Sequence, residues 1–335
     1  MKEKEVKNSI ILIIPYFGDF NNYFDLWMNS AKKNKQIDFM IVTDNKVRTG
    51  LASNIIWKEA NFEEIKKKIQ ELVPEIKIRL NEPYKLCEYK PFYGKLFEEQ
   101  IKGYKFWGFC DVDLIFGALD HFITEDVLEN FDKCYCRGHL TIYRNDEFFR
   151  ELYKTKDKRL NVTYRTAWRT DYCCHFDETL VWNAIIKEKG RKCYEKVDFA
   201  DIDFRVKRFR IGFGRNKNDA KQIYAIEEGG LYRYYIEKDK VNKDEMAYIH
   251  LQKRPMKVLI TDMNKYLIVP NAFIPYRKVT SELILRFSPE ERVWKYYYKR
   301  RIKEIASNIK NGAFKIRIIV MFRRFIYGKN SNFNG

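Results

Sequence analysis

Short apolar runs alternate with amphipathic segments through the first third of the chain. Apolar runs of strand length occur in residues 9–16, 37–45 and 105–110. Segments with apolar positions at helical spacing lie between them, in residues 21–34, 61–73 and 90–104. Asn61 precedes the second of these segments and is the residue type expected at a helix N-cap. The alternation predicts an α/β fold with a mostly parallel central sheet flanked by helices.

Polar residues follow each of these predicted strands directly. The first run ends in PYFG, residues 15–18, the second in Thr43-Asp44, and the third in DVD, residues 111–113. Parallel strands present their carboxyl ends at one edge of the sheet, where ligands bind in open α/β folds. We therefore expect these three segments to lie together and to form a site.

The pattern changes after residue 120. Residues 133–145 are typical of a strand pair turning at Gly138, residues 222–236 of a hairpin turning at Gly229-Gly230, and residues 246–254 of a strand that ends at His250. Residues 176–190 predict a helix with Asp177 at or near its N-terminus. This half reads as a mixed lobe on one sheet rather than as a separate domain. We expect one domain over residues 1–280, with halves at 1–120 and 121–280, and a helical basic tail over 281–335.

Positive charge is concentrated at the C-terminus. The 335 residues carry a net charge of +18, and the stretch from Glu291 to the end accounts for +10 of it. Residues 303–330 mix Ile, Val, Met and Phe with Lys and Arg, as in helices that lie on anionic membranes. The alternative is a helix packed on the body with a solvated basic face.

The chain shows no targeting or spanning segment. The N-terminal apolar run IILII is too short for a signal sequence, and no run of about 20 apolar residues occurs. We expect a cytoplasmic protein, peripheral on the inner face of the cell membrane, whose seven cysteines stay reduced as buried filler. No C-x-x-C occurs, so a structural zinc site is not expected.

The acids Asp111 and Asp113 end a buried apolar run, where unpaired charges are costly. Two carboxylates at this spacing suit Mn²⁺ or Mg²⁺, which takes protein carboxylates together with substrate phosphates. One alternative is a pair of helix caps. Another is the haloacid-dehalogenase phosphatase signature, although that strand usually opens its domain, and here over 100 residues precede it.

Seven segments in order resemble a bacterial family of GT-A-type glycosyltransferase-like proteins found in capsule and surface-polysaccharide clusters. They are IIPYFG, VTDN, PYKLCEYKPFYG, WGFCDVDLIFG, GHLTIYRN, FDET and YIHLQKR, spanning roughly residues 9–255. The resemblance implies a GT-A-like, Rossmann-like fold and a hexosyltransferase. Such an enzyme moves a sugar from a UDP-sugar to a surface glycan or a lipid-linked oligosaccharide, as in capsule or lipopolysaccharide biosynthesis.

The resemblance also implies a set of site residues. The metal ligands are Asp111, Asp113 and His250, the last otherwise a structural histidine. Asp177 or Glu178 is a general base in an inverting reaction, with an N-cap as the alternative for Asp177. The expected nucleotide-sugar contacts are Pro15, Tyr16, Phe17, Gly18, Asp44, Lys85, Lys90, Asp111, His139, Lys253 and Arg254. His139 is equally well read as a core histidine, and the role of Glu88 and of the pair Cys173-Cys174 stays open.

A nucleic-acid-binding protein is the rival class, because the charge and the 16% aromatic content permit it. No zinc-knuckle, RRM-like or helix-turn-helix signature occurs, and the charge lies beside apolar residues in the tail. The sequence therefore favours a metal-dependent transferase with no nucleic-acid partner.

Overall fold

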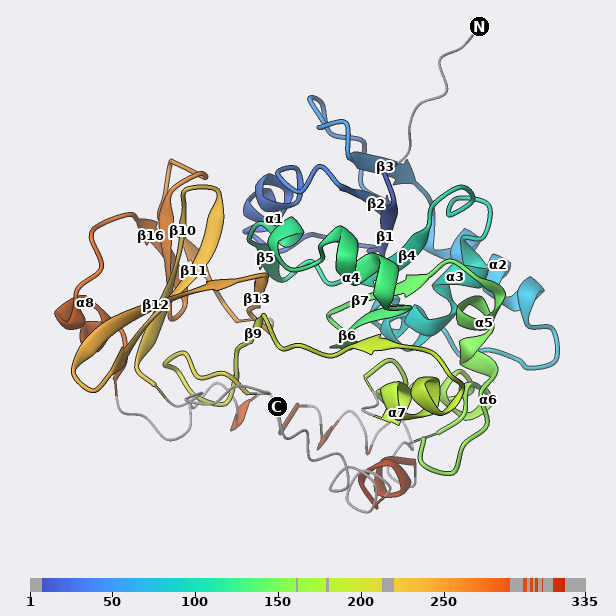
Figure 1. Ribbon diagram of the computed structural model, residues 1–335. Helices are drawn as coiled ribbons and strands as arrows, with labels where there is room; N and C mark the ends of the chain where they lie inside the picture. Colours follow the sequence, from blue (N-terminus) through green and yellow to red (C-terminus); the bar gives the residue numbers. More distant parts are fainter. Residues whose placement is uncertain are drawn as a thin grey trace, which may run out of the picture.

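The fold is α/β, and the described residues form three sheets (Figure 1). The computed structural model describes residues 8–160, 162–178, 181–212, 220–252 and 254–289, and in the tail residues 298–299, 302–303, 305–306, 309 and 316–322. The α/β class predicted from the alternating pattern is confirmed.

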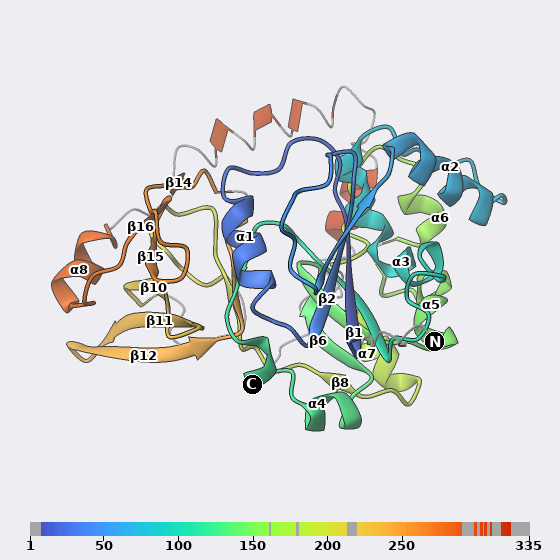
Figure 2. The same ribbon diagram turned by 90° about the horizontal axis from the view of Figure 1, so that it is seen from above.

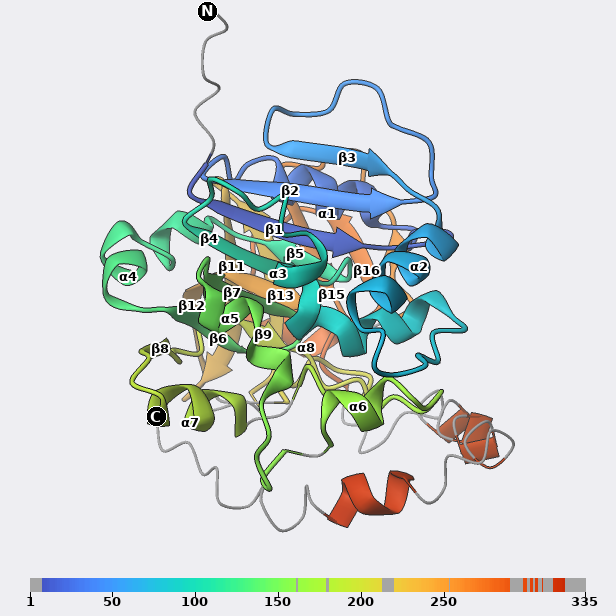
Figure 3. The same ribbon diagram turned by 90° about the vertical axis from the view of Figure 1, so that its right-hand side faces the viewer.

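The largest sheet has seven strands in the order β3-β2-β1-β4-β7-β6-β8. They are β1 (Ile10–Pro15), β2 (Ile37–Thr43), β3 (Ile55–Glu59), β4 (Phe106–Cys110), β6 (Lys133–Arg137), β7 (Leu140–Arg144) and β8 (Cys193–Tyr194). β1 to β4 run parallel, and β7 runs antiparallel to β4. The chain moves outward from β1 to β3 and then returns to place β4 on the other side of β1 (Figure 3). The switch point of the sheet therefore lies between β1 and β4, where ligands are expected.

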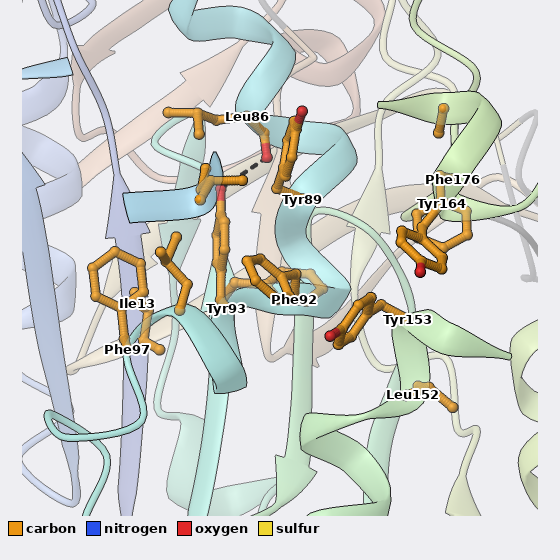
Figure 4. Close-up of a cluster of buried hydrophobic side chains, with 14 of the residues drawn as sticks. Ile13, Leu86, Tyr89, Phe92, Tyr93, Phe97, Leu152, Tyr153, Tyr164 and Phe176 are labelled. Atoms are coloured by element: carbon orange, nitrogen blue, oxygen red, sulfur yellow. Dashed lines mark hydrogen bonds between the residues drawn. The ribbon is translucent and has the colours of Figure 1, made fainter. Parts of the chain in front are cut away.

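Both faces of this sheet are buried. Ile11 and Ile13 of β1 pack into one apolar cluster, and Ile10, Leu12 and Ile14 pack into another on the opposite face. The first cluster also contains Tyr89, Phe92 and Tyr93, which lie between the sheet and Tyr153 (Figure 4). Burial on both sides explains why the strands read as continuous apolar runs.

Helical segments cover the two faces (Figure 2). On the face of Ile11 and Ile13 lie α2 (Phe62–Leu72), η1 (Pro83–Phe92), α3 (Tyr93–Leu96), α5 (Glu147–Arg150), η3 (Leu152–Lys154), α6 (Tyr164–Ala167) and α7 (Val181–Glu188). On the other face lie α1 (Phe24–Ala31), η2 (Leu119–His121) and α4 (Glu125–Asn130). The Asn61 cap of α2 is confirmed, because its side chain accepts from Glu63 N and the Glu64 carboxylate accepts from Asn61 N.

The helix predicted over residues 90–104 is wrong in extent. The chain instead forms the 3₁₀ helix η1, then the single turn α3, and then turns up to residue 103. Pro91 has no N–H to donate and so interrupts a regular α-helical ladder. Gly94 lets α3 approach the sheet, since a Cβ there would come within 2.5 Å of the Trp107 ring.

The expectation of a single sheet is also wrong, because the second half builds two more. A six-stranded sheet contains β10 (Gln222–Glu227), β11 (Gly230–Glu237), β12 (Lys240–Met246), β14 (Lys257–Val258), β15 (Tyr266–Val269) and β16 (Ala272–Pro275). A three-stranded sheet joins β5 (Leu114–Phe116), β13 (Tyr248–His250) and β9 (Ala200–Asp201). The predicted β10–β11 hairpin is confirmed, but its turn is at Glu228-Gly229, which both have positive φ, one residue before the predicted Gly229-Gly230.

The predicted tail over residues 281–335 divides into different parts. α8 (Ser281–Arg286) packs on the six-stranded sheet through Leu283 and Ile284. Most of residues 303–330 lie outside the described residues, but residues 316–322 are helical and bury Val320 against the first cluster. Within the described part of the chain, no helix combines the length and the apolar character needed to cross a membrane.

Candidate functional site

The two acids after β4 are held at the switch point by their own backbone. Asp111 N donates to the carbonyl of His139 at 2.9 Å, and Trp27 Nε1 donates to the Asp111 carbonyl at 3.0 Å. The chain continues from Asp113 directly into β5, so neither acid caps a following helix. The helix-cap alternative for this pair is therefore wrong.

Asp111, Asp113 and His250 form a cluster at this point. Each offers a ligand atom, and the three atoms lie within 4.8 Å of one another. His250 Nε2 lies 3.4 Å from Asp113 Oδ1, and β13 brings the two together by pairing with β5. Two carboxylates and an imidazole are a donor set that suits Mn²⁺, and also Mg²⁺ when substrate phosphates complete the shell. The residues predicted as metal ligands thus fit a divalent cation.

The imidazole of His250 lies between two carboxylates, those of Asp113 and Asp201. Burial lowers the pKa of its imidazole, but Asp113 and Asp201 outweigh burial and raise the pKa well above the ordinary value. Without metal, the protonated ring neutralises these acids. If the ring were a metal ligand, its ligating nitrogen would be deprotonated, and a divalent cation would supply the positive charge instead.

Lys90 joins three segments of the site. Its ammonium lies 2.7 Å from Asp111 Oδ1, 2.7 Å from the carbonyl of Gly138 and 3.4 Å from Asp177 Oδ2. Burial lowers the pKa of Lys90, but Asp111 and Asp177 outweigh it and raise the pKa well above the ordinary value. The sequence predicted this lysine as a nucleotide contact, and the structure brings it to the predicted metal ligand and to a predicted base.

Asp177 and Glu178 lie beside the turn between β6 and β7. Burial raises the pKa of Asp177 to about 7, although Lys90 opposes the shift. Glu178 lies 3.3 Å from His175, and that contact lowers the pKa of Glu178 against the effect of burial. A carboxyl group that titrates near neutral pH is suited to accept a proton. The turn that an Asp177 cap would serve includes residues 179 and 180, which lie outside the described residues.

Glu88 positions the segment that leads to Asp177. Its fully buried carboxylate accepts from Cys174 N at 3.0 Å, from Phe176 N at 3.1 Å and from the Cys173 thiol at 3.3 Å. The role left open in the sequence is thus a structural one. The Cys173 thiol also lies 3.5 Å from the Cys87 thiol, so the cysteines pack where η1 meets this segment.

Lys85 does not face the cluster of Asp111, Asp113 and His250. Its ammonium lies 3.5 Å from Glu88 and donates to the Tyr172 carbonyl, and the residue is 5% exposed. These partners give Lys85 a structural role in place of the predicted nucleotide contact.

The PYFG loop closes onto the end of β2. Gly18 N donates to Asp44 Oδ1 at 2.9 Å, and Gly18 has a positive φ of 88° that suits glycine. Tyr16 stacks on Phe20 at 4.8 Å between ring centroids, and burial followed by Asp113 raises its pKa. The structure thus brings Gly18 and Asp44 together and Tyr16 near Asp113, and their predicted nucleotide contacts stay predictions.

The other two residues of this loop have structural environments. Phe17 is 7% exposed and packs in the core, and Pro15 ends β1 beside Val42. The nucleotide contacts expected of Phe17 and Pro15 stay predictions.

His139 lies next to the cluster of Asp111, Asp113 and His250. Its ring centroid is 4.4 Å from that of His250, and its Nδ1 lies 3.1 Å from Tyr248 Oη. Its Nε2 is buried and has no hydrogen-bond partner among the described residues. Burial and the His250 charge lower the pKa of His139 to about 3, so the ring is neutral. This location combines the two readings, a buried histidine and a residue lining the site.

Arg254 lies away from the cluster and is 3% exposed. Its guanidinium donates to the carbonyls of Asp203 at 3.2 Å, Val206 at 2.9 Å and Lys207, so it holds the loop after β9. This geometry favours a structural role over the predicted contact with a diphosphate. Lys253, predicted with it, lies outside the described residues.

Asp201 is a site residue that sequence reasoning missed. It ends β9 beside His250 in the parallel pairing of β9 with β13. The signal was present, because Asp201-Ile202-Asp203 repeats the D-x-D spacing between the apolar residues Ala200 and Phe204. Asp203 serves a different purpose and binds Arg205 and Arg210.

A family model matches most of the chain. The profile described as "Family of unknown function (DUF6625)" matches residues 12–277, which begin inside β1 and include all the site residues named above. No curated protein matches the chain.

Proposed function

Because the chain belongs to DUF6625, a family of unknown function, we propose its function from the site itself. The protein is a metal-dependent glycosyltransferase that moves a sugar from a nucleotide-sugar, a UDP-sugar, to a surface glycan or a lipid-linked oligosaccharide. Mn²⁺ or Mg²⁺ is its cofactor.

One observation carries this proposal: Asp111, Asp113 and His250 converge at the switch point of a parallel sheet. A cation site at that point is placed to receive a nucleotide bound across the ends of β1 and β4. The hydrogen bond from Gly18 to Asp44 and the effect of Asp113 on Tyr16 support the proposal that these residues of the loop and of the segment after β2 bind the base and the ribose. A GT-A-like fold is the finer form of the observed α/β class that this arrangement supports.

Each group has a definite task in such a transfer. Asp111, Asp113 and His250 would hold the cation, which would supply positive charge to offset the charge that develops on a departing diphosphate. Lys90 holds Asp111 and Asp177 in fixed relation, and its charge offsets both carboxylates. Asp177, with a pKa near 7, accepts the proton of the acceptor hydroxyl in an inverting reaction, and Glu178 is the adjacent candidate for that proton.

The test is ligand-induced stabilisation followed by turnover. We expect UDP with Mn²⁺ to raise the melting temperature of the full chain, and EDTA to abolish the shift. A screen of UDP-sugars, with UDP release as the readout, should find a donor. Asp113→Asn should remove both effects while the far-UV spectrum stays unchanged.

The matched control for this test is Asp120→Asn, which changes an exposed acid in η2 and should behave as the wild type. No shift with any nucleoside diphosphate would contradict the proposal. Release of inorganic phosphate from simple phosphate esters would favour the phosphatase reading instead.

We also propose that the tail holds the enzyme at an anionic lipid surface. In helical residues 316–322, Ile318, Ile319, Met321 and Phe322 are 46–64% exposed although they are apolar. They lie within the stretch that carries the net charge of +10. Exposed apolar groups among cations are typical of interfacial helices, and lipid-linked acceptors lie at such a surface.

Vesicle flotation tests this location. The protein should float with vesicles that contain phosphatidylglycerol and not with vesicles of pure phosphatidylcholine. The double variant Ile318→Ser/Phe322→Ser should not float with either kind of vesicle. Leu259→Ser removes a comparably exposed apolar side chain from the loop after β14 and should leave flotation intact. Salt-sensitive binding of oligonucleotides in place of vesicles would favour the nucleic-acid class.

A further inference from the structure

Asp201 and His250 occupy paired positions on neighbouring strands. β9 and β13 run parallel, and their register places Asp201 beside His250. The amide of Ile202 donates to the His250 carbonyl at 3.0 Å, which fastens the two strands at this point. Asp201 is 9% exposed, so its carboxylate needs partners inside the protein.

The partners of this carboxylate are specific. Asp201 Oδ1 lies 2.8 Å from His250 Nδ1 and 2.6 Å from Gln252 Nε2, which donates to it. The other ring nitrogen, His250 Nε2, lies 3.4 Å from Asp113 Oδ1. The imidazole therefore bridges two carboxylates, one on each side of the ring.

This geometry has a consequence for ligation. An imidazole binds a metal through a nitrogen lone pair, and it presents Nε2 only when the proton is on Nδ1. An acceptor at Nδ1 fixes both that tautomer and the orientation of the ring. Asp201 is placed to be this acceptor, and Gln252 fixes the carboxylate in turn.

We propose that Asp201 is a positioning residue that directs His250 Nε2 into the divalent-cation site, and that Gln252 supports it. The inference rests on the proposed function, because it assumes that His250 is a ligand of Mn²⁺ or Mg²⁺. It adds residues that lie behind the ligand and assigns Asp201, the first acid of the second D-x-D, to the site.

The competing role for Asp201 is direct ligation. Asp201, His139 and His250 also offer ligand atoms within 4.8 Å of one another. Asp201 Oδ1, however, already bonds His250 and Gln252, and it lies at the ring nitrogen remote from Asp113. These contacts favour the positioning role over a place in the coordination shell.

The experiment is a titration of the full-length protein with Mn²⁺, with free Mn²⁺ followed by electron paramagnetic resonance. Asp201→Asn keeps the size of the side chain and weakens the acceptor, and we expect its Kd to rise about 10- to 100-fold. Gln252→Ala should raise the Kd less. Asp113→Asn should abolish binding in the measured range.

Asp198→Asn is the control, because Asp198 is a buried acid three residues before Asp201 that pairs with Tyr194 Oη and Lys196 instead of His250. Its Kd should equal that of the wild type. Urea unfolding without metal, run on all variants, separates folding from ligation. A structural role alone would lower metal-free stability and leave the Kd of the folded protein unchanged.

The outcomes are distinguishable. A wild-type Kd for Asp201→Asn overturns the positioning role while the metal site stands. Complete loss of binding, as for Asp113→Asn, overturns it in favour of direct ligation. If the wild type binds no Mn²⁺ with or without UDP, the proposed function fails and this inference fails with it.

Discussion

The carboxylate of Asp177 lies 3.4 Å from the ammonium of Lys90 in the interior of the protein, where the two side chains are 3% and 8% exposed. The same ammonium lies 2.7 Å from Asp111. One buried cation thus connects the segment after β4 with the segment before α7. The positive charge of Lys90 offsets the negative charges of the Asp111 and Asp177 carboxylates.

Replacing Lys90 by Met tests this connection. The substitution keeps the length of the side chain and leaves a buried carboxylate without its cation, so we expect a loss of about 3–5 kcal/mol in the free energy of unfolding. Urea unfolding at neutral pH measures it. Lys95→Met removes a partly exposed pair with Glu98 and should cost at most about 1 kcal/mol. Equal losses for the two variants would contradict the connecting role.

The pH dependence of turnover tests Asp177 as the base. Because burial raises its pKa to about 7, the ionised form accumulates as the pH rises from 6 to 8, and the rate should rise with a midpoint near 7. Asp177→Asn should lose this rise and most of the turnover, yet still bind UDP with Mn²⁺. A flat profile over this range would exclude Asp177 as the base.

The same shift predicts a stability effect of opposite direction. The folded-state pKa lies above the ordinary value of 3.8, so the unfolded chain releases the proton first as the pH rises. The contribution of this carboxyl group to stability is therefore complete below about pH 4 and is lost as the pH approaches 7. Relative to the wild type, Asp177→Asn should become progressively more stable from pH 4 to 7, as measured by urea unfolding.

Gly138→Ala should displace the candidate base. A Cβ at this position would lie 2.6 Å from Glu178 Cγ and 2.8 Å from Asp177 Oδ2, so those side chains must move. We expect kcat to fall, the affinity for Mn²⁺ to change little, and stability to drop by about 1–3 kcal/mol. At Gly212 the nearest atom would be 3.6 Å away, so Gly212→Ala serves as the control with near wild-type kinetics.

Glu88→Gln should loosen the segment before Asp177. An amide has one oxygen in place of two and brings two donors into a site that already supplies N–H groups from Cys174 and Phe176. Leaving such groups unsatisfied costs about 1–3 kcal/mol each, so both stability and turnover should fall. Glu98→Gln, at a partly exposed acid, should change neither. Unchanged turnover in Glu88→Gln would show that the segment holds its shape without this carboxylate.

Local patterns predicted the first half of the fold well because its strands are buried on both faces and its α2 helix has a capping box. β3 escaped prediction, since its five residues are only partly buried and show no strong apolar run. The three-stranded sheet escaped as well. It joins β5, β9 and β13, and no local signal connects segments separated by about 50 to 130 residues.

Some residues of the candidate site could likewise be predicted from local sequence, and others could not. Asp111 and Asp113 could be found because acids at the end of an apolar strand are conspicuous, whereas Asp201 acquires its meaning only from its pairing with His250. Lys85 and Arg254 were predicted as nucleotide-sugar contacts from their place near a motif, and a basic residue near a motif does not reveal in which direction its side chain points. Their buried carboxylate and carbonyl partners decide that direction.

β13 pairs with β5 on one side and with β9 on the other. Side chains alternate between the two faces of a strand, so a shift of one residue would turn His250 to the opposite face and bring Ile249 or Leu251 between the acids. A strand fixed on both edges cannot slip in this way without breaking two ladders at once. Single-residue insertions or deletions inside β13 should therefore abolish metal binding. Changes in the length of the outer connection between β11 and β12 should leave metal binding unchanged.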